Sequence, residues 1–195
     1  MSDLAQRIAQ LSAEDRARLE ERLLAVRKDK QAQRIPRRSG TGPAPLSFAQ
    51  ERMWFLEQLY PDKAAYNEQS VYRLRGALNV TALTQSMQTI VQRHEVLRTV
   101  YREVEGELVQ IVLTESEIDL AMLDISDLPA QEQEAEIQRI ANQDARRPFD
   151  LVHGPVHRTK LIRLANNEFV LIQTRHHIAT DGWSSGVCLR GKPTL

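Results

Sequence analysis

Apolar residues recur at helical spacing in residues 1–30. They lie three or four positions apart in two groups that begin at Leu4 and at Leu19. Ser12-Ala13-Glu14-Asp15 resembles a capping box, which opens a helix. The pattern predicts two short amphipathic helices, packed either on their own domain or against another protein.

Three further segments have the helical period, and each carries a signal at one end. Ser47 is placed to cap a helix over residues 48–59. A strongly amphipathic pattern predicts a helix from Val80 to Leu97. A third helix begins near Ala130 and continues to Arg146, because Pro148 stops it.

Apolar and polar residues alternate in most of the remaining chain, which predicts β-strands. Gly106 separates two of them as a hairpin turn, and Asn166-Asn167 separates two more. The predicted strands cover residues 71–74, 98–104, 108–113, 118–123, 156–164 and 168–174. Because strands and helices mix without strict β-α-β repetition, the expected fold class is α/β in the broad sense, an α+β two-layer sandwich.

Three parts of the chain are expected. Residues 1–30 form the helical segment. Residues 31–45 form a linker, in which basic residues precede the stretch Ser39-Gly40-Thr41-Gly42-Pro43-Ala44-Pro45. Residues 46–195 form the compact domain.

Composition limits the possible functions. Lys plus Arg and Asp plus Glu both number 26, and this zero net charge indicates neither nucleic-acid nor membrane-surface binding. Cys188 is the single cysteine, which excludes a disulfide or a cysteine-based metal cluster within one chain. The sequence has no apolar stretch of membrane-spanning length and no secretory leader, so a cytoplasmic protein is expected.

The candidate chemistry lies in His176-His177-Ile178-Ala179-Thr180-Asp181-Gly182, directly after the last predicted strand. Imidazole moves protons near neutral pH. Neighbouring residues of an extended segment point to opposite faces, so only one histidine can enter a given cavity. Asp181-Gly182 is a turn signal, and glycine lets the backbone approach a substrate closely. A buried histidine pair before an ordinary turn is the plainer alternative, but the spacing favours an acyl-transfer site.

Three stretches together resemble the first core motifs of the condensation domains of nonribosomal peptide synthetases. They are Ser47-Phe48-Ala49-Gln50-Glu51-Arg52-Met53-Trp54-Phe55-Leu56, Arg93-His94-Glu95-Val96-Leu97-Arg98-Thr99 and the segment from His176 to Ser184. The resemblance implies one of two fused lobes like chloramphenicol acetyltransferase, with the reaction in a tunnel between them. Such domains join two acyl groups that carrier proteins hold as thioesters.

The resemblance also implies residue roles. His177 would face the tunnel and accept a proton from the acceptor amine or position that amine, while His176 would belong to the scaffold. Asp181 would be mainly structural, and Gly182 would let the backbone approach the reacting carbonyl. No metal or cofactor would be bound directly, since 4′-phosphopantetheine would arrive on partner carrier proteins beside adjacent synthetase domains.

The family pattern stops after Gly186-Val187, and Gly191 and Pro193 interrupt the helix expected there. The expectation is therefore a truncated condensation domain, an amide-forming acyltransferase that takes an L-configured donor and is inactive without its second lobe. One alternative is a catalytically silent fragment that binds a carrier protein or a neighbouring part of a synthetase. Another is a related acyltransferase with the same histidine motif that transfers acyl groups to alcohols.

Overall fold

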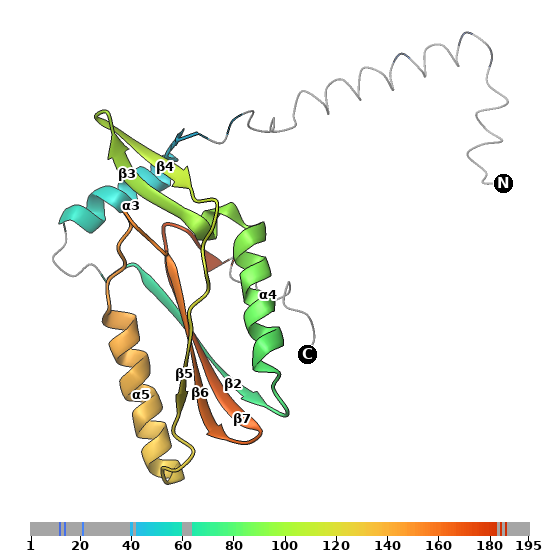
Figure 1. Cartoon of the computed structure of the whole chain (residues 1–195). Helices are drawn as coiled ribbons and strands as arrows, with labels where there is room; N and C mark the ends of the chain where they lie inside the picture. Colours follow the sequence, from blue (N-terminus) through green and yellow to red (C-terminus); the bar gives the residue numbers. More distant parts are fainter. Residues whose placement is uncertain are drawn as a thin grey trace. The chain divides into compact units, whose positions relative to one another are not determined.

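The structure is a computed structural model of the whole chain (Figure 1). It describes residues 42–59 and 64–182, together with the single residues 12, 14, 21, 40, 184 and 186. The chain divides into two compact units, Met1–Thr41 and Gly42–Leu195. The predicted N-terminal helices, most of the predicted linker and the segment after Gly186 lie outside the described residues.

The second unit contains all the elements that follow. They run in the order β1 (Ala44–Pro45), α3 (Phe48–Leu59), β2 (Asn67–Arg75), α4 (Val80–Arg93), the 3-10 helix η1 (Glu95–Arg98), β3 (Thr99–Val104), β4 (Glu107–Val112), β5 (Leu120–Asp124), α5 (Ala130–Arg146), β6 (His157–Ala165) and β7 (Glu168–His176). Among the described residues, no helix has the length and apolar character needed to cross a membrane.

The ends of α3 and α5 follow the sequence signals. The Ser47 N–H donates to Gln50 Oε1 at 2.9 Å, and the Gln50 N–H donates back to Ser47 Oγ at 3.3 Å. This reciprocal pair is a capping box, so the predicted cap at Ser47 is confirmed. Helix α5 spans Ala130–Arg146, which confirms the prediction for that segment.

Helix α4 is shorter than predicted. It ends at Arg93, because His94 adopts an extended backbone with φ −108° and ψ 96°. Residues Glu95–Arg98 then form the separate helix η1. Leu97 is buried, so its apolar character reflects its place in the core and not a continuation of α4.

Strands form two sheets. The larger has the order β2-β7-β6-β5, and the smaller has the order β1-β4-β3. Strand β7 lies between β2 and β6 and is antiparallel to both. Both predicted hairpins, β3–β4 and β6–β7, are confirmed. Strand β5 is parallel to β6, and α5 is the crossover between them.

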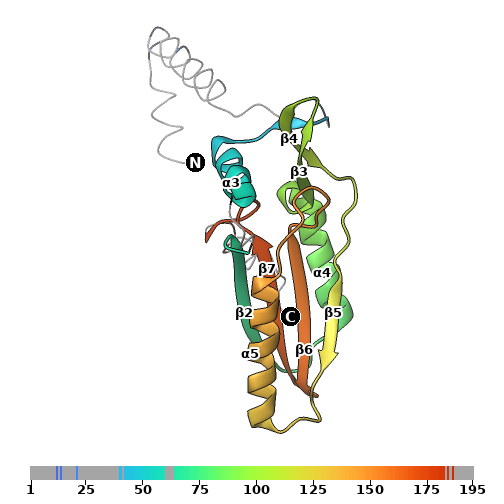
Figure 2. The same ribbon diagram turned by 90° about the vertical axis from the view of Figure 1, so that its left-hand side faces the viewer.

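Helices α4 and α5 cover opposite faces of the larger sheet, as Figures 1 and 2 show. Leu161 and Leu171 pack against α4, whereas Ile162 and Ile172 pack against α5. Neighbouring residues of a strand point to opposite faces, so successive side chains of β6 and β7 pack alternately against α4 and α5. Both faces of these two strands are therefore buried, and the predicted α+β sandwich is confirmed.

A third apolar cluster supports the end of β7. It joins the loop residues Ile178 and Ala179 to Tyr101 of β3 and to Phe149 and Leu151, which follow α5. The Tyr101 N–H also donates to the Leu151 carbonyl at 2.8 Å. The smaller sheet therefore fixes the loop that follows the central strand of the larger one.

Candidate active site

Strand β7 ends at the two histidines. The His176 N–H donates to the Val156 carbonyl at 3.0 Å, and the His177 N–H donates to the Tyr66 carbonyl at 2.9 Å. The two partners lie directly before β6 and β2, the neighbours of β7. The backbone of the histidine pair is thus held from both sides.

The first ring, His176, is enclosed. Its side chain has no exposed surface, and its Nε2 lies 3.4 Å from Glu57 Oε2 of α3. Its Nδ1 accepts the Ile178 N–H at 3.1 Å, so the neutral ring carries its proton on Nε2. The ring of Phe149 meets it edge-on at 6.1 Å. Burial, helped by the neighbouring His177, lowers the pKa of His176 to about 4.

The second ring, His177, has a different environment. Its side chain is 36% exposed, and its Nδ1 lies 2.7 Å from Glu68 Oε1 of β2. The other oxygen of that carboxylate, Oε2, accepts the hydroxyl of Thr180 at 2.9 Å. One carboxylate of β2 therefore holds two residues of the histidine motif.

An open groove of about 490 Å³ lies beside His177. One wall comes from the motif, with His177, Thr180 and Asp181, and another comes from α3, with Gln50 and Met53. We call it the His177 groove. Its volume lies in the range of small-molecule sites, roughly 300–1,000 Å³.

Asp181 and Ser184 bond to each other at the start of the next helical segment. Asp181 Oδ1 accepts the Ser184 N–H at 2.7 Å, and the Asp181 N–H donates to Ser184 Oγ at 2.8 Å. Gly182, Ser184 and Gly186 are helical, so the Asp181 side chain acts as an N-cap.

Gly182 exposes its backbone. A Cβ built at this position meets no atom within 4 Å, so another molecule has room to approach the main chain. The N–H groups of a first helical turn lack intrahelical partners. The Ser184 N–H of this turn donates to Asp181, so Gly182 is the position at which another molecule has room to approach the main chain.

A buried tyrosine braces the motif loop. Gln50 Nε2 donates to the Tyr101 hydroxyl at 3.4 Å, and that hydroxyl donates to the Ile178 carbonyl at 3.5 Å. Burial raises the pKa of Tyr101 to about 12, although the hydrogen bond from Gln50 acts in the opposite direction. Tyr101 therefore stays a neutral donor and links α3 to the loop.

The sequence pattern predicted His176, His177, Asp181 and Gly182 as site residues but did not indicate Glu57, Glu68 or Tyr101. A signal for Glu68 exists in the sequence. In β2 the alternate positions Ser70, Tyr72 and Leu74 share its face. An acid on a strand face that packs against a helix needs a polar partner.

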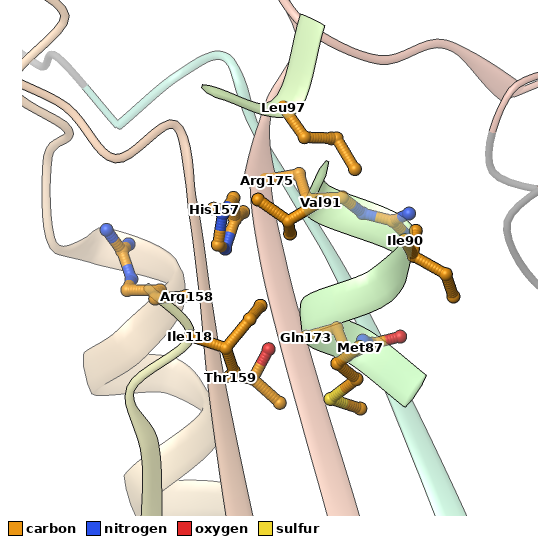
Figure 3. A pocket seen from close by; sticks show the side chains of 10 residues that line it. All are labelled: Met87, Ile90, Val91, Leu97, Ile118, His157, Arg158, Thr159, Gln173 and Arg175. Atoms are coloured by element: carbon orange, nitrogen blue, oxygen red, sulfur yellow. The ribbon is translucent and has the colours of Figure 1, made fainter. Parts of the chain in front are cut away.

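A second, smaller cavity of about 40 Å³ lies between α4 and the larger sheet (Figure 3). His157 and Arg175 face each other there in the β6–β7 register. Burial, with the charge of Arg175 as a second cause, lowers the pKa of His157 to about 4. In Figure 3 the Arg175 side chain extends past Val91 and away from the His157 ring. Across the described part of the chain, no group of three or more His, Cys, Asp or Glu could hold a metal ion.

Two solved structures from peptide synthetases share this fold. The starter condensation domain of rhizomide synthetase RzmA superposes with a TM-score of 0.70 at 23% identity, over 77% of this chain and 36% of that one. A four-domain nonribosomal peptide synthetase bound to AMP and glycine gives a TM-score of 0.69 at 20% identity, over 82% of this chain and 12% of that one. The chain therefore has the fold of chloramphenicol acetyltransferase-like condensation domains.

Sequence comparison then gives the family. The model for the condensation domain matches residues 41–191. A linear gramicidin synthase of Brevibacillus parabrevis is 45% identical over 175 residues, or 89% of this chain and 3% of that protein. Phosphinothricin tripeptide synthetase PhsC of Streptomyces viridochromogenes is 40% identical over 196 residues, or 100% of this chain and 18% of that protein. This chain belongs to the condensation domain family of nonribosomal peptide synthetases, and it spans a small part of the length of these relatives.

Proposed function

We propose that the chain takes part in amide bond formation between aminoacyl or peptidyl groups that carrier proteins hold as thioesters. The main support is the different placement of two adjacent histidines. His177 lines the His177 groove, whereas His176 is buried against Glu57. A single imidazole is thus presented where an acceptor amine could reach it.

The acceptor amine needs to lose a proton before it can react. An α-amino group has an ordinary pKa of about 7.7–8.0, so near neutral pH much of it is protonated. The amine nitrogen forms the new C–N bond, the C–S bond of the thioester breaks, and the proton is transferred to the departing sulfur. We assign to His177 Nε2 the acceptance or positioning of that proton, because Nδ1 is already in contact with Glu68.

The tetrahedral intermediate of this reaction carries an oxyanion. We propose that backbone N–H groups near Gly182 stabilise it, because they lie at the start of a helical segment and beside open space. Asp181 keeps this turn in place through its bonds with Ser184. In this scheme Asp181 is structural, and His176 anchors the end of β7 to α3.

The substrates in this proposal arrive on the 4′-phosphopantetheine arms of carrier proteins, and adjacent synthetase domains are the further partners. The chain itself would supply the histidine and the backbone donors, and no directly bound metal or cofactor enters the scheme. The chain spans 36% of the length of the RzmA condensation domain structure. The proposal therefore includes a second lobe that completes the tunnel.

A second candidate is a binding module without turnover. One face of α3 exposes Phe48, Phe55 and Leu59, at 90%, 61% and 60%. Their spacing of seven and four residues puts them on one side of the helix. An apolar stripe of this kind is typical of a surface that contacts another protein.

Amide formation between two loaded carrier proteins tests both candidates. Three samples are compared: the chain alone, the chain with a supplied second lobe, and the supplemented His177→Ala variant. Product from the supplemented chain, lost on His177→Ala, supports the enzymatic proposal. If the lobes assemble and bind carrier protein but form no amide, the binding module is favoured. His153→Ala is the control, because His153 is exposed and pairs with Asp150 away from the groove.

A further inference from the structure

Glu68 lies outside the histidine motif but contacts it at two points. Its Oε1 is 2.7 Å from His177 Nδ1, and its Oε2 accepts the Thr180 hydroxyl at 2.9 Å. We propose that Glu68 is a positioning residue that selects which ring nitrogen of His177 faces the substrates. This inference rests on the proposed function, because it concerns the same histidine.

The contact determines where the proton of the neutral ring lies. The two atoms are not aligned as a hydrogen bond, but at 2.7 Å the negative charge of the carboxylate repels a lone pair and favours a hydrogen on the nitrogen that faces it. In His177 this nitrogen is Nδ1, and Nε2 therefore keeps its lone pair. Glu68 thus makes Nε2 the nitrogen that can take or hold a proton of the amine.

The neighbouring histidine is arranged in the reverse way. In His176 Nδ1 accepts the Ile178 N–H, and Nε2 faces the Glu57 carboxylate. Two adjacent rings are therefore held as opposite tautomers. The Ile178 N–H of the motif and Glu57 of α3 face the two nitrogens of His176, whereas Glu68 of β2 faces Nδ1 of His177.

The backbone around Glu68 holds the carboxylate in place. Glu68 pairs with Arg175 in the β2–β7 register. The side chain of its neighbour Asn67 donates to the carbonyls of Ala145 and Arg147, at 2.7 and 2.8 Å. Thr180 then fixes the second carboxylate oxygen. Glu68 is consequently a held group, which a positioning role requires.

Nitrogen NMR of the full chain with ¹⁵N-labelled histidine tests the tautomer directly. The five histidines are assigned with single variants, including His177→Ala, and spectra are taken at a pH where the ring is neutral. The expected result is a protonated Nδ1 and an unprotonated Nε2 for His177 in the wild type. Glu68→Ala should move His177 toward the Nε2–H form, and Glu68→Asp should restore part of the original signal.

Two controls separate positioning from general damage. Thr180→Val removes the contact that holds the other carboxylate oxygen but keeps the carboxylate, so the Nδ1–H form of His177 should decrease less than in Glu68→Ala. Glu168→Ala removes an acid at the far end of the same strand pair, where it contacts Arg73 and Arg75, and it should change neither tautomer nor activity. The signals of the other histidines report whether each variant is folded.

Activity completes the test in the supplemented carrier-protein assay. Glu68→Ala should lower kcat about ten- to hundredfold with little change in KM, the size typical when the orienting partner of a functional histidine is lost. An unchanged tautomer in Glu68→Ala would overturn the inference whatever the activity, and so would a changed tautomer with full activity. If the supplemented wild type forms no amide, the proposed function fails. The NMR comparison of the wild type with Glu68→Ala then still decides whether Glu68 sets the tautomer of His177.

Discussion

Two carboxylates on opposite faces of the larger sheet differ in depth. Asp144 of α5 is 1% exposed and lies 2.9 Å from Lys160 Nζ, with Arg158 and Thr174 as further partners. Glu68 of β2 is 36% exposed and contacts His177 and Thr180. Both acids contact a basic side chain and a threonine, but Asp144 is buried, whereas Glu68 is half-exposed and its partner His177 lines the His177 groove.

The buried cluster remains charged for a definite reason. Burial alone raises the pKa of Asp144, but the hydrogen bonds from Thr174 and Lys160 and the charge of Arg158 outweigh it and hold the pKa below its ordinary value. Removal of one partner from a carboxylate enclosed in this way strongly lowers the free energy of unfolding, because an unpaired charge stays buried. The two acids therefore differ in what their loss would leave behind, which is largely buried cations beside Asp144 and a half-exposed imidazole beside Glu68.

Removal of the buried acid should have the largest effect. Asp144→Ala leaves Lys160 and Arg158 without their carboxylate, which should lower the free energy of unfolding by about 3–5 kcal/mol. Urea denaturation measures this loss. Asp124→Ala is the matched control, because Asp124 pairs with Arg163 and bonds to Ser126 at the surface, so its removal should lower the free energy of unfolding far less. If both variants lost the same free energy of unfolding, the burial of Asp144 would not explain its contribution to stability.

As the pH decreases, protonation of the buried histidines should destabilise the domain at a higher pH than protonation of Asp144 does. His157 and His176 have a native pKa of about 4 against an ordinary 6.5. The unfolded chain therefore binds more protons between these values, and stability falls as pH decreases from 6.5 toward 4. Each histidine should account for up to about 3 kcal/mol.

Urea unfolding at several pH values measures this dependence. His157→Gln should remove the share of one histidine from the slope between pH 6.5 and 4. The Asp144 contribution should persist above the ordinary value of 3.8 and fall only as pH decreases through its lowered native pKa. A free energy of unfolding that stays level from pH 6.5 to 4 would contradict the prediction for both histidines.

The cap of α3 should have a smaller effect. Gln50→Ala removes the bond to the Ser47 N–H and the contact with Tyr101, which should lower the free energy of unfolding by about 1 kcal/mol. Gln58→Ala, at the other end of α3, is the control in the same denaturation experiment. A loss shared by both variants would indicate a change in helix propensity and not in the cap.

The smallest change in stability should come from the exposed histidine. His177→Ala removes a side chain that is 36% exposed, so the free energy of unfolding should change by less than about 0.5 kcal/mol. The same variant should lower amide formation by about a hundredfold or more in the supplemented assay. A large loss of stability would place His177 with the buried group instead.

Local signals in the sequence predict the ends of the helices better than the bounds of the strands. Ser47 and Pro148 mark helix ends because capping and ring constraints act within a few residues. The end of α4 at Arg93 was missed, since Leu97 keeps the apolar spacing although the backbone turns at His94. The start of β5 at Leu120 and the full length of β2 were likewise only approximated.

The pairing of strands that are far apart in the chain could not be predicted from the sequence pattern. Nothing local indicates that β2 pairs with β7 or that β5 runs parallel to β6. The histidine motif is continuous and was found, but Glu57 and Glu68 lie more than a hundred residues before the rings that they contact. Such partners become visible only once the strands are ordered in space.

The backbone N–H groups of His176 and His177 are bonded to the segments before β6 and β2, and this limits which wall of the groove can change. Amides in a central strand exchange with deuterium only when the sheet opens, so this wall of the groove should be among the slowest regions of the domain to exchange. The opposite wall, with Gln50 and Met53, belongs to α3, which contacts the sheets through side chains such as Gln50 and Glu57. Substitutions along α3 can therefore alter the groove while the backbone of the histidine pair keeps its place.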